Sequence, residues 1–152
     1  MYEIRVTERI QAARERVFDA IADHEYFFRG PDFEYCRVTV EGEEDRNGLG
    51  AVREISVNGL IFTEEIVRFE RPSRLDYIVR TLVRASGKAV PLRHQGGQMQ
   101  LTESGDGTEI EWVSRFEVTV SLLGWLIERL VGPRTARGFS ALLFQAKSEL
   151  ER

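Results

Sequence analysis

Three polar side chains on strand-like segments are the candidates for chemistry in this sequence: Tyr77, His94 and Ser114. A phenol, an imidazole and a hydroxyl can pass protons, but a general base also needs a partner within hydrogen-bond reach, and the sequence identifies none for His94. By strict strand alternation His94 faces away from Met99, so it reaches the same face only if a bulge at Gly96-Gly97 shifts the alternation. The three residues are therefore catalytic candidates that belong to no recognised motif.

Other familiar chemistries lack the residues that they need. Cys36, His24 and His94 show no short ligand spacing, so we expect no metal site. No serine lies in a nucleophile-elbow sequence, and Gly48-Leu49-Gly50 and Gly96-Gly97 are too short for a phosphate-binding loop. We therefore expect neither a metal nor a cofactor.

Two adjacent carboxylates, Glu64 and Glu65, lie in a strand-like run. Neighbouring strand residues point to opposite faces, so one of the two faces inward, although the sequence does not say which. A buried carboxylate needs a partner, and the candidates are Arg53, Arg68 and Arg80.

The composition is typical of one soluble globular domain over residues 1–152, with 42% hydrophobic and 30% charged residues. A net charge of −4 disfavours nucleic acid as a partner. The single cysteine, Cys36, excludes an internal disulfide and fits a reducing compartment. The first ten residues show no secretory signal, and charges interrupt every apolar stretch before it reaches the roughly 18 residues of a membrane span. We expect a cytoplasmic protein that does not span a membrane.

Hydrophobic periodicity predicts the elements that must position these residues. Residues 2–10 alternate as a strand does, Ala13, Val17, Phe18 and Ile21 form a helical stripe, and DHEYFFRGPDF follows as a short second helix or turn. Five or six β segments come next, with runs at 33–41, 50–57, 60–70, 74–84, 93–104 and 108–118. Asn58-Gly59 indicates a hairpin, because both turn residues accept a positive φ. This order predicts an antiparallel sheet with one apolar face that needs a cover.

The terminal stretch 120–150 is the segment large enough to supply that cover. Its apolar residues Phe139, Leu142, Leu143, Ala146 and Leu150 recur at helical spacing. A proline inside a helix costs about 3 kcal/mol, whereas one at the first helical position costs little. Gly132-Pro133 therefore predicts a division into a short helix or loop over 121–131, with Ser121 as its N-cap, and a covering helix over 134–151.

Several segments resemble the polyketide cyclase/dehydrase and lipid-transport superfamily over nearly the whole chain. They are IRVTERIQAARERVFDAIADHEYFF, GLGAVREI, EEIVRFERPSRLDYIV, GDGTEIEWVSRFEV and LLFQAKSELER. The resemblance implies the α+β helix-grip fold shared with START domains, aromatase/cyclases and the birch pollen allergen. In that fold a curved antiparallel sheet of six to seven strands wraps around a long C-terminal helix, with two short helices after the first strand. It also implies a deep hydrophobic pocket between sheet and helix.

Strand alternation selects the side chains that would line this pocket. On the last strand Trp112, Ser114 and Phe116 share the face opposite to the charged residues, and Met99 and Tyr77 face the same way on their strands. The predicted ligand-binding set is Tyr77, Met99, Trp112, Ser114 and Phe116 from the sheet, with Phe139, Leu142, Leu143 and Ala146 from the helix. His24 is placed near the pocket mouth.

Three functions remain open at this point. The first is binding of a hydrophobic small molecule, such as a lipid, a polyketide or an isoprenoid. The second is a polyketide cyclase or dehydratase reaction in the same pocket, with Tyr77, His94 and Ser114 moving protons. The third is an interaction module that uses the Leu122–Val131 face to contact a protein or a membrane surface. The ligand and the oligomeric state are not specified by the sequence.

Overall fold

A curved antiparallel sheet forms the body of the protein, seen in a computed structural model that describes residues 1–120 and 124–152. Within these residues seven strands pair in the order β1-β7-β6-β5-β4-β3-β2. The strands are β1 (Tyr2–Ile10), β2 (Phe33–Val40), β3 (Val52–Val57), β4 (Leu60–Glu70), β5 (Arg74–Arg84), β6 (Leu92–Ser104) and β7 (Gly107–Val118). The helices are α1 (Arg14–Ala22), α2 (His24–Phe27) and α3 (Gly124–Leu150). The predicted helix-grip architecture is confirmed.

Local sequence signals account for the strands and their turns. The alternation of β1 places Ile4 and Ile10 in the core, while the charged residues between them face solvent. The turn between β3 and β4 has positive φ at both Asn58 (51°) and Gly59 (76°), as the Asn-Gly signal predicts.

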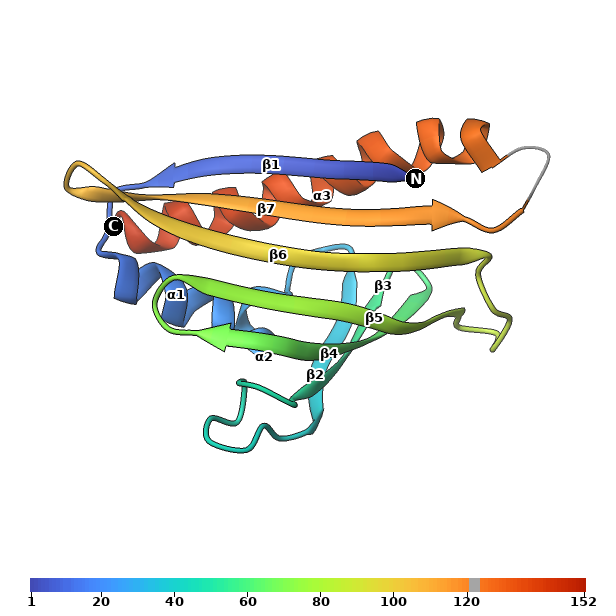
Figure 1. Ribbon diagram of the computed structural model, residues 1–152, viewed down its shortest axis with the longest axis horizontal. Coiled ribbons are helices and arrows are strands. Elements are labelled where there is room, and N and C mark those ends of the chain that lie inside the picture. Colours follow the sequence, from blue (N-terminus) through green and yellow to red (C-terminus); the bar gives the residue numbers. More distant parts are fainter. Residues whose placement is uncertain (121–123) are drawn as a thin grey trace.

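The sheet bends strongly between its two ends. In Figure 1, β1, β7 and β6 run along the length of the molecule, whereas β2 and β3 cross the view steeply. Pairing between β5 and β6 is confined to Arg74–Tyr77 with Gly97–Gln100, so the two strands diverge beyond Tyr77. Pairing of β6 with β7 shifts between His94 and Gly96, directly before the Gly96-Gly97 pair, and this bulge meets the condition under which His94 faces inward.

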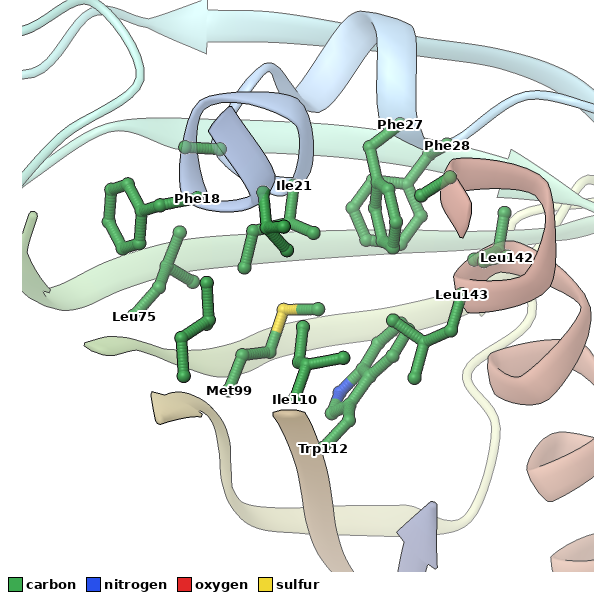
Figure 2. Close-up of a cluster of buried hydrophobic side chains, with 14 of the residues drawn as sticks. Phe18, Ile21, Phe27, Phe28, Leu75, Met99, Ile110, Trp112, Leu142 and Leu143 are labelled. Atoms are coloured by element: carbon green, nitrogen blue, oxygen red, sulfur yellow. The ribbon is translucent and has the colours of Figure 1, made fainter. Parts of the chain in front are cut away.

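All three helices lie on the concave face of the sheet. α3 packs mainly on β1 and β7, and α1 and α2 cover the neighbouring part (Figure 1). Figure 2 shows side chains from α1, α2 and α3 meeting Leu75, Met99, Ile110 and Trp112 of the sheet. None of the described helices combines the length and the apolar character needed to cross a bilayer.

The predicted division of the terminal segment at Gly132-Pro133 is wrong, because α3 is one helix with Pro133 inside it. Proline lacks an N–H, so the carbonyl of Arg129 loses its helical partner. Arg129 and Pro133 are both exposed, and water can solvate that carbonyl. Thr135 also donates its hydroxyl to the Val131 carbonyl, at 3.0 Å, within the same turn.

Close packing against β1 favours the unbroken helix. Gly132 is buried, and a Cβ built on it would lie 2.2 Å from the Tyr2 ring, so only glycine lets α3 approach this closely. The predicted N-cap, Ser121, lies outside the described residues.

Candidate functional site

The interior between the sheet and the helices is walled by aromatic rings. Trp112 of β7 stacks flat on Phe139 of α3, with ring centroids 3.8 Å apart and 6° between the planes. Phe27 of α2 and Phe28, the residue after it, also approach Trp112, at 5.8 and 6.3 Å between ring centroids (Figure 2). Trp112 therefore links the sheet with both α2 and α3.

The predicted pocket-lining residues are nearly all buried in this interior. Met99, Trp112, Leu142, Leu143 and Ala146 belong to the main apolar cluster. Phe139 packs against that cluster and is only partly buried. Phe116 is also buried, but its ring packs on Tyr2, 5.5 Å away, towards the other end of β7. Burial agrees with the predicted facing of these side chains, while their part in binding a ligand remains a prediction.

A hydrogen-bonded chain brings the three catalytic candidates together. Trp112 donates its indole N–H to the Tyr77 hydroxyl oxygen at 2.9 Å. His94 Nε2 lies 2.8 Å from Ser114 Oγ, and the backbone N–H of Val79 donates to His94 Nδ1 at 3.1 Å. The Tyr77 and His94 rings stack, with centroids 5.4 Å apart.

The bulge in β6 is what places His94 in this chain. It turns the His94 side chain into the gap where β5 and β6 diverge, and there its ring accepts the Val79 N–H that no neighbouring strand pairs. Opposite Tyr77 stands Gly97, where an added Cβ would lie 2.2 Å from the Tyr77 ring. Gly97 therefore lets the ring lie flat across β6 and aim its hydroxyl at Trp112.

The protonation states in this chain follow from its contacts. A backbone N–H can only donate, so His94 Nδ1 is unprotonated, and the ring proton sits on Nε2 and is donated to Ser114. Burial lowers the pKa of His94 to about 4, so the ring is neutral near pH 7. Burial, and then the charge of Glu64, raise the pKa of Tyr77, which stays a phenol. The chain is thus uncharged.

A second polar cluster is charged and lies beneath α2. Glu64 is the inward carboxylate, and it accepts from Arg53 Nε at 2.8 Å, while Glu65 faces outward to Arg80. Arg53 has 1% of its surface exposed, and its guanidinium lies over the rings of Phe28 and Tyr77. This ion pair is neutral as a whole and fully desolvated.

His24 completes this cluster and does not lie at a pocket mouth, so that prediction is wrong. The ring is fully buried, accepts from Arg53 Nη1 at 2.9 Å and donates to the Asn47 carbonyl at 2.8 Å. Burial and the Arg53 charge lower the pKa of His24 well below its ordinary value. His24 therefore acts as a neutral link between β3 and the loop after β2.

Arg53 is one of the three partners that the sequence offers for the inward carboxylate, and a further signal in the sequence would have selected it. In β3, Arg53 alternates with Ala51 and Ile55, which are buried, so period-2 facing puts the arginine inside. An arginine between two inward apolar residues indicates a buried ion pair.

Two hollows stand out among the described residues, and neither is the predicted interior. One, of about 140 Å³, lies between α2 and α3 beside Arg29 and Glu149. The other, of about 290 Å³, lies at the gap between β5 and β6, around Tyr77, Gly96 and Gly97. Between sheet and α3, the Trp112–Phe139 stack occupies the predicted space.

Metal ligation has no basis in the geometry of residues 1–120 and 124–152, where no three His, Cys, Asp or Glu side chains cluster suitably. Cys36 is half-buried, and burial raises the pKa of its thiol to about 12, which leaves it without thiolate character.

Comparison with known proteins gives a family and a fold. The family model described as "Polyketide cyclase / dehydrase and lipid transport" matches residues 1–151. A START superfamily protein from Mycobacterium smegmatis is similar in structure, with 13% identity, a TM-score of 0.73 and coverage of 99% of this chain and 98% of that one. The protein TTHA0849 from Thermus thermophilus has 17% identity, a TM-score of 0.72 and coverage of 98% and 97%.

The Aha1 dimer from Colwellia psychrerythraea has 13% identity, a TM-score of 0.65 and coverage of 99% and 97%. At these identities the likeness concerns the fold alone. No curated protein sequence matches the chain.

Proposed function

The chain belongs to the polyketide cyclase / dehydrase and lipid transport family, and from this premise we propose that it binds a hydrophobic small molecule between its sheet and α3. Family and fold together support a ligand-binding or cyclase-like role. The ligand would contact Trp112, Met99 and Ser114 on the sheet and Leu142, Leu143 and Ala146 on the helix. Its class is that of lipids, polyketides and isoprenoids.

The Trp112–Phe139 stack is the observation that carries this proposal. Phe139 is only partly buried, and it covers the face of Trp112 at ring-contact distance, as a bound apolar ligand would. The polar side chains of Tyr77, Ser114 and His94 lie next to this stack. Burying polar groups costs free energy unless each is paired, so the stability of the fold does not account for their presence here. Apolar walls with a few convergent polar groups are typical of small-molecule sites. A ligand would displace Phe139 and take its place on Trp112.

The proton positions favour binding over a cyclase or dehydratase reaction. A general base needs a free lone pair, and the lone pair of His94 is already occupied by the Val79 N–H. Ser114 receives a proton from His94 and does not give one up to it. The chain can donate a hydrogen bond to a ligand but is poorly arranged to remove a proton from one.

Native mass spectrometry and a neutral fluorophore test the binding proposal. We expect the purified protein to carry a small molecule that is lost on denaturation, or, once stripped, to bind Nile red with one-to-one stoichiometry. If the protein neither carries a molecule nor binds Nile red, the proposal is wrong.

The first half of α3 favours a second function, docking on a membrane surface. Trp125 and Leu130 are 60% and 64% exposed, and Leu126 lies beside them. Arg129, Arg134 and Arg137 share this exposed side. This set of six residues is the α3 basic face; Leu122 and Leu123 of the predicted interaction surface lie outside the described residues.

The occupant that fits the α3 basic face is an anionic bilayer. Within the described part of the chain, none of its three guanidinium groups has a carboxylate at ion-pair distance, and Glu128 of the same segment is turned inward to the Val118 N–H. The face therefore carries a local positive charge on a chain whose net charge is −4. Exposed tryptophan and leucine beside arginines are typical of helices that lie in the interface of anionic membranes.

Vesicle sedimentation tests this second proposal. We expect binding to phosphatidylglycerol vesicles that weakens with salt, little binding to phosphatidylcholine vesicles, and loss of binding in Leu130→Glu. Phe144→Glu is the matched control, because Phe144 is equally exposed on α3 but lies about two helical turns beyond Arg137, the last residue of the basic face. Equal binding by both variants, or none by the unmodified protein, contradicts membrane docking.

A further inference from the structure

Donor and acceptor roles in the interior polar chain can be assigned from its backbone contact. The chain begins at the Val79 N–H, which can only donate, and this fixes His94 as an acceptor at Nδ1 and a donor at Nε2. Ser114 Oγ accepts the His94 proton, so its own hydroxyl proton is free to be donated onward. Tyr77 is close enough to Ser114 for this neighbour to lower the pKa of the phenol, against the larger effect of burial.

The Tyr77 hydroxyl lies at the inner end of this group of polar side chains. The Tyr77 oxygen accepts from the Trp112 indole N–H at 2.9 Å. Among residues 1–120 and 124–152, no side chain or carbonyl accepts the Tyr77 proton. A hydroxyl oxygen that accepts a hydrogen bond has a more polarised O–H, and the hydrogen bond that this O–H donates becomes stronger. Tyr77 is thus a buried donor that still needs an acceptor.

A second unsatisfied donor lies next to it. Arg53 Nη2 is buried and makes no hydrogen bond of adequate geometry within the described residues, although Glu64 Oε1 is 2.7 Å away. The Arg53 guanidinium carbon lies 4.9 Å from the centre of the Tyr77 ring. The uncommitted groups of Tyr77 and Arg53 are therefore both donors, whereas the unpaired acceptor nearby, Asn47 Oδ1, belongs to the loop residue whose carbonyl accepts from His24.

The charges of the interior are already balanced. Arg53 is neutralised by Glu64, both histidines are neutral rings, and Tyr77 is a neutral phenol. An ionised ligand group placed here would be desolvated without a counter-ion, which makes its binding unfavourable. A carboxylate or an ammonium group at this end of a ligand is therefore disfavoured.

We infer that the ligand of the proposed function ends in an uncharged carbonyl group, such as that of a ketone, a quinone or an ester, which accepts the Tyr77 proton inside the sheet. This inference rests on the proposed function, because it names the chemistry of the ligand at the same site. Tyr77 is a positioning and specificity residue: it selects an acceptor, and the Trp112 N–H that its oxygen accepts helps to orient its O–H. Gly97 allows the ring to occupy this place.

Displacement of Nile red by four compounds that share one undecyl chain tests the inference. They are the alkane, the methyl ketone, the carboxylic acid and the primary amine, measured at pH 8. We expect the ketone to bind about tenfold more tightly than the alkane, because one buried hydrogen bond contributes about that much to the affinity. The ionised acid and amine are expected to bind more weakly than the ketone. In Tyr77→Phe the preference for the ketone over the alkane is expected to be lost.

A spectroscopic measurement separates this loss from misfolding. The carbonyl stretching frequency of the bound ketone is expected below its value in hexane, and in Tyr77→Phe, which removes the donor, it is expected to return towards that value. Tighter binding of the acid or the amine, or an equal ketone preference in Tyr77→Phe, overturns the inference and leaves the binding function standing. Failure of all four compounds, the alkane included, contradicts the proposed function itself.

Discussion

Glu64 and Arg53 form an ion pair inside the sheet, with Nε and Oε1 2.8 Å apart, whereas the adjacent Glu65 pairs with Arg80 at the surface. The two carboxylates are neighbours in sequence and differ mainly in solvation, so they make a matched pair. Glu64→Gln leaves the Arg53 charge buried without a counter-ion, and we expect it to lower the free energy of unfolding by about 3 kcal/mol. Glu65→Gln removes only a screened surface pair, with an expected loss below about 1 kcal/mol.

Urea unfolding of the two variants measures this difference. Equal losses would mean that the interior around Arg53 is hydrated. The double variant Arg53→Met with Glu64→Leu is expected to recover most of the lost stability, because a buried pair can be replaced by apolar residues of similar volume.

A glycine substitution tests the placement of Tyr77. Gly97→Ala puts a Cβ 2.2 Å from the Tyr77 ring, and we expect a loss of about 1–3 kcal/mol, because the ring must leave its place near Trp112. Gly138→Ala is the control, since Gly138 lies in α3 with nothing within 4 Å of the added Cβ. There the variant is expected to stabilise the protein by about 0.5–1 kcal/mol. A neutral Gly97→Ala would show that Tyr77 is not held against β6.

The pH dependence of stability reports on the buried histidines. The folded protein holds His94 neutral, with a pKa of about 4, while the unfolded chain binds a proton near its ordinary pKa of about 6.5. The contribution of the neutral His94 ring to the free energy of unfolding is therefore fully present above pH 6.5. It is lost as the pH drops towards 4, by up to about 1.4 kcal/mol per pH unit for each histidine of this kind. His24 adds to this slope, because its pKa is also lowered.

Urea unfolding at pH 7 and pH 5 measures the slope, and His94→Gln is expected to reduce it. This interval lies above the pH at which most carboxylates titrate. An unchanged slope in His94→Gln would contradict the burial of a neutral ring at this position.

The sequence predicts the sheet well because its signals are local. Strand alternation, the Asn58-Gly59 turn and the glycine pair at 96–97 each act over a few residues, and the structure has strands, hairpin and bulge where they indicate. Pro133 misled the prediction, because the compensation lies outside the helix, in the packing of Gly132 on Tyr2. The burial of His24 likewise depends on Arg53, 29 positions away in the chain.

The candidate site could be predicted in part. Period-2 facing identifies Trp112, Tyr77, Met99 and Ser114 as inward, and the bulge admits His94. The direction of the hydrogen bonds could not be predicted, since it depends on the Val79 N–H being left unpaired where β5 and β6 diverge. Whether the interior is filled or hollow also depends on the position of α3, which no local signal sets.

The binding of Nile red to Phe139→Ala tests the central claim most directly. Trp112 fluorescence reports on the site once the other tryptophan is removed, so the parent and both variants in this experiment carry Trp125→Phe. If Phe139 occupies the ligand site, a ligand that binds Phe139→Ala no longer has to displace a stacked ring. Nile red is then expected to bind about tenfold more tightly and to quench the fluorescence of Trp112. Phe144→Ala, a change on the solvent side of α3, is expected to bind as the parent does. Equal affinity in Phe139→Ala and Phe144→Ala, without quenching of Trp112, would contradict a ligand site between the sheet and α3.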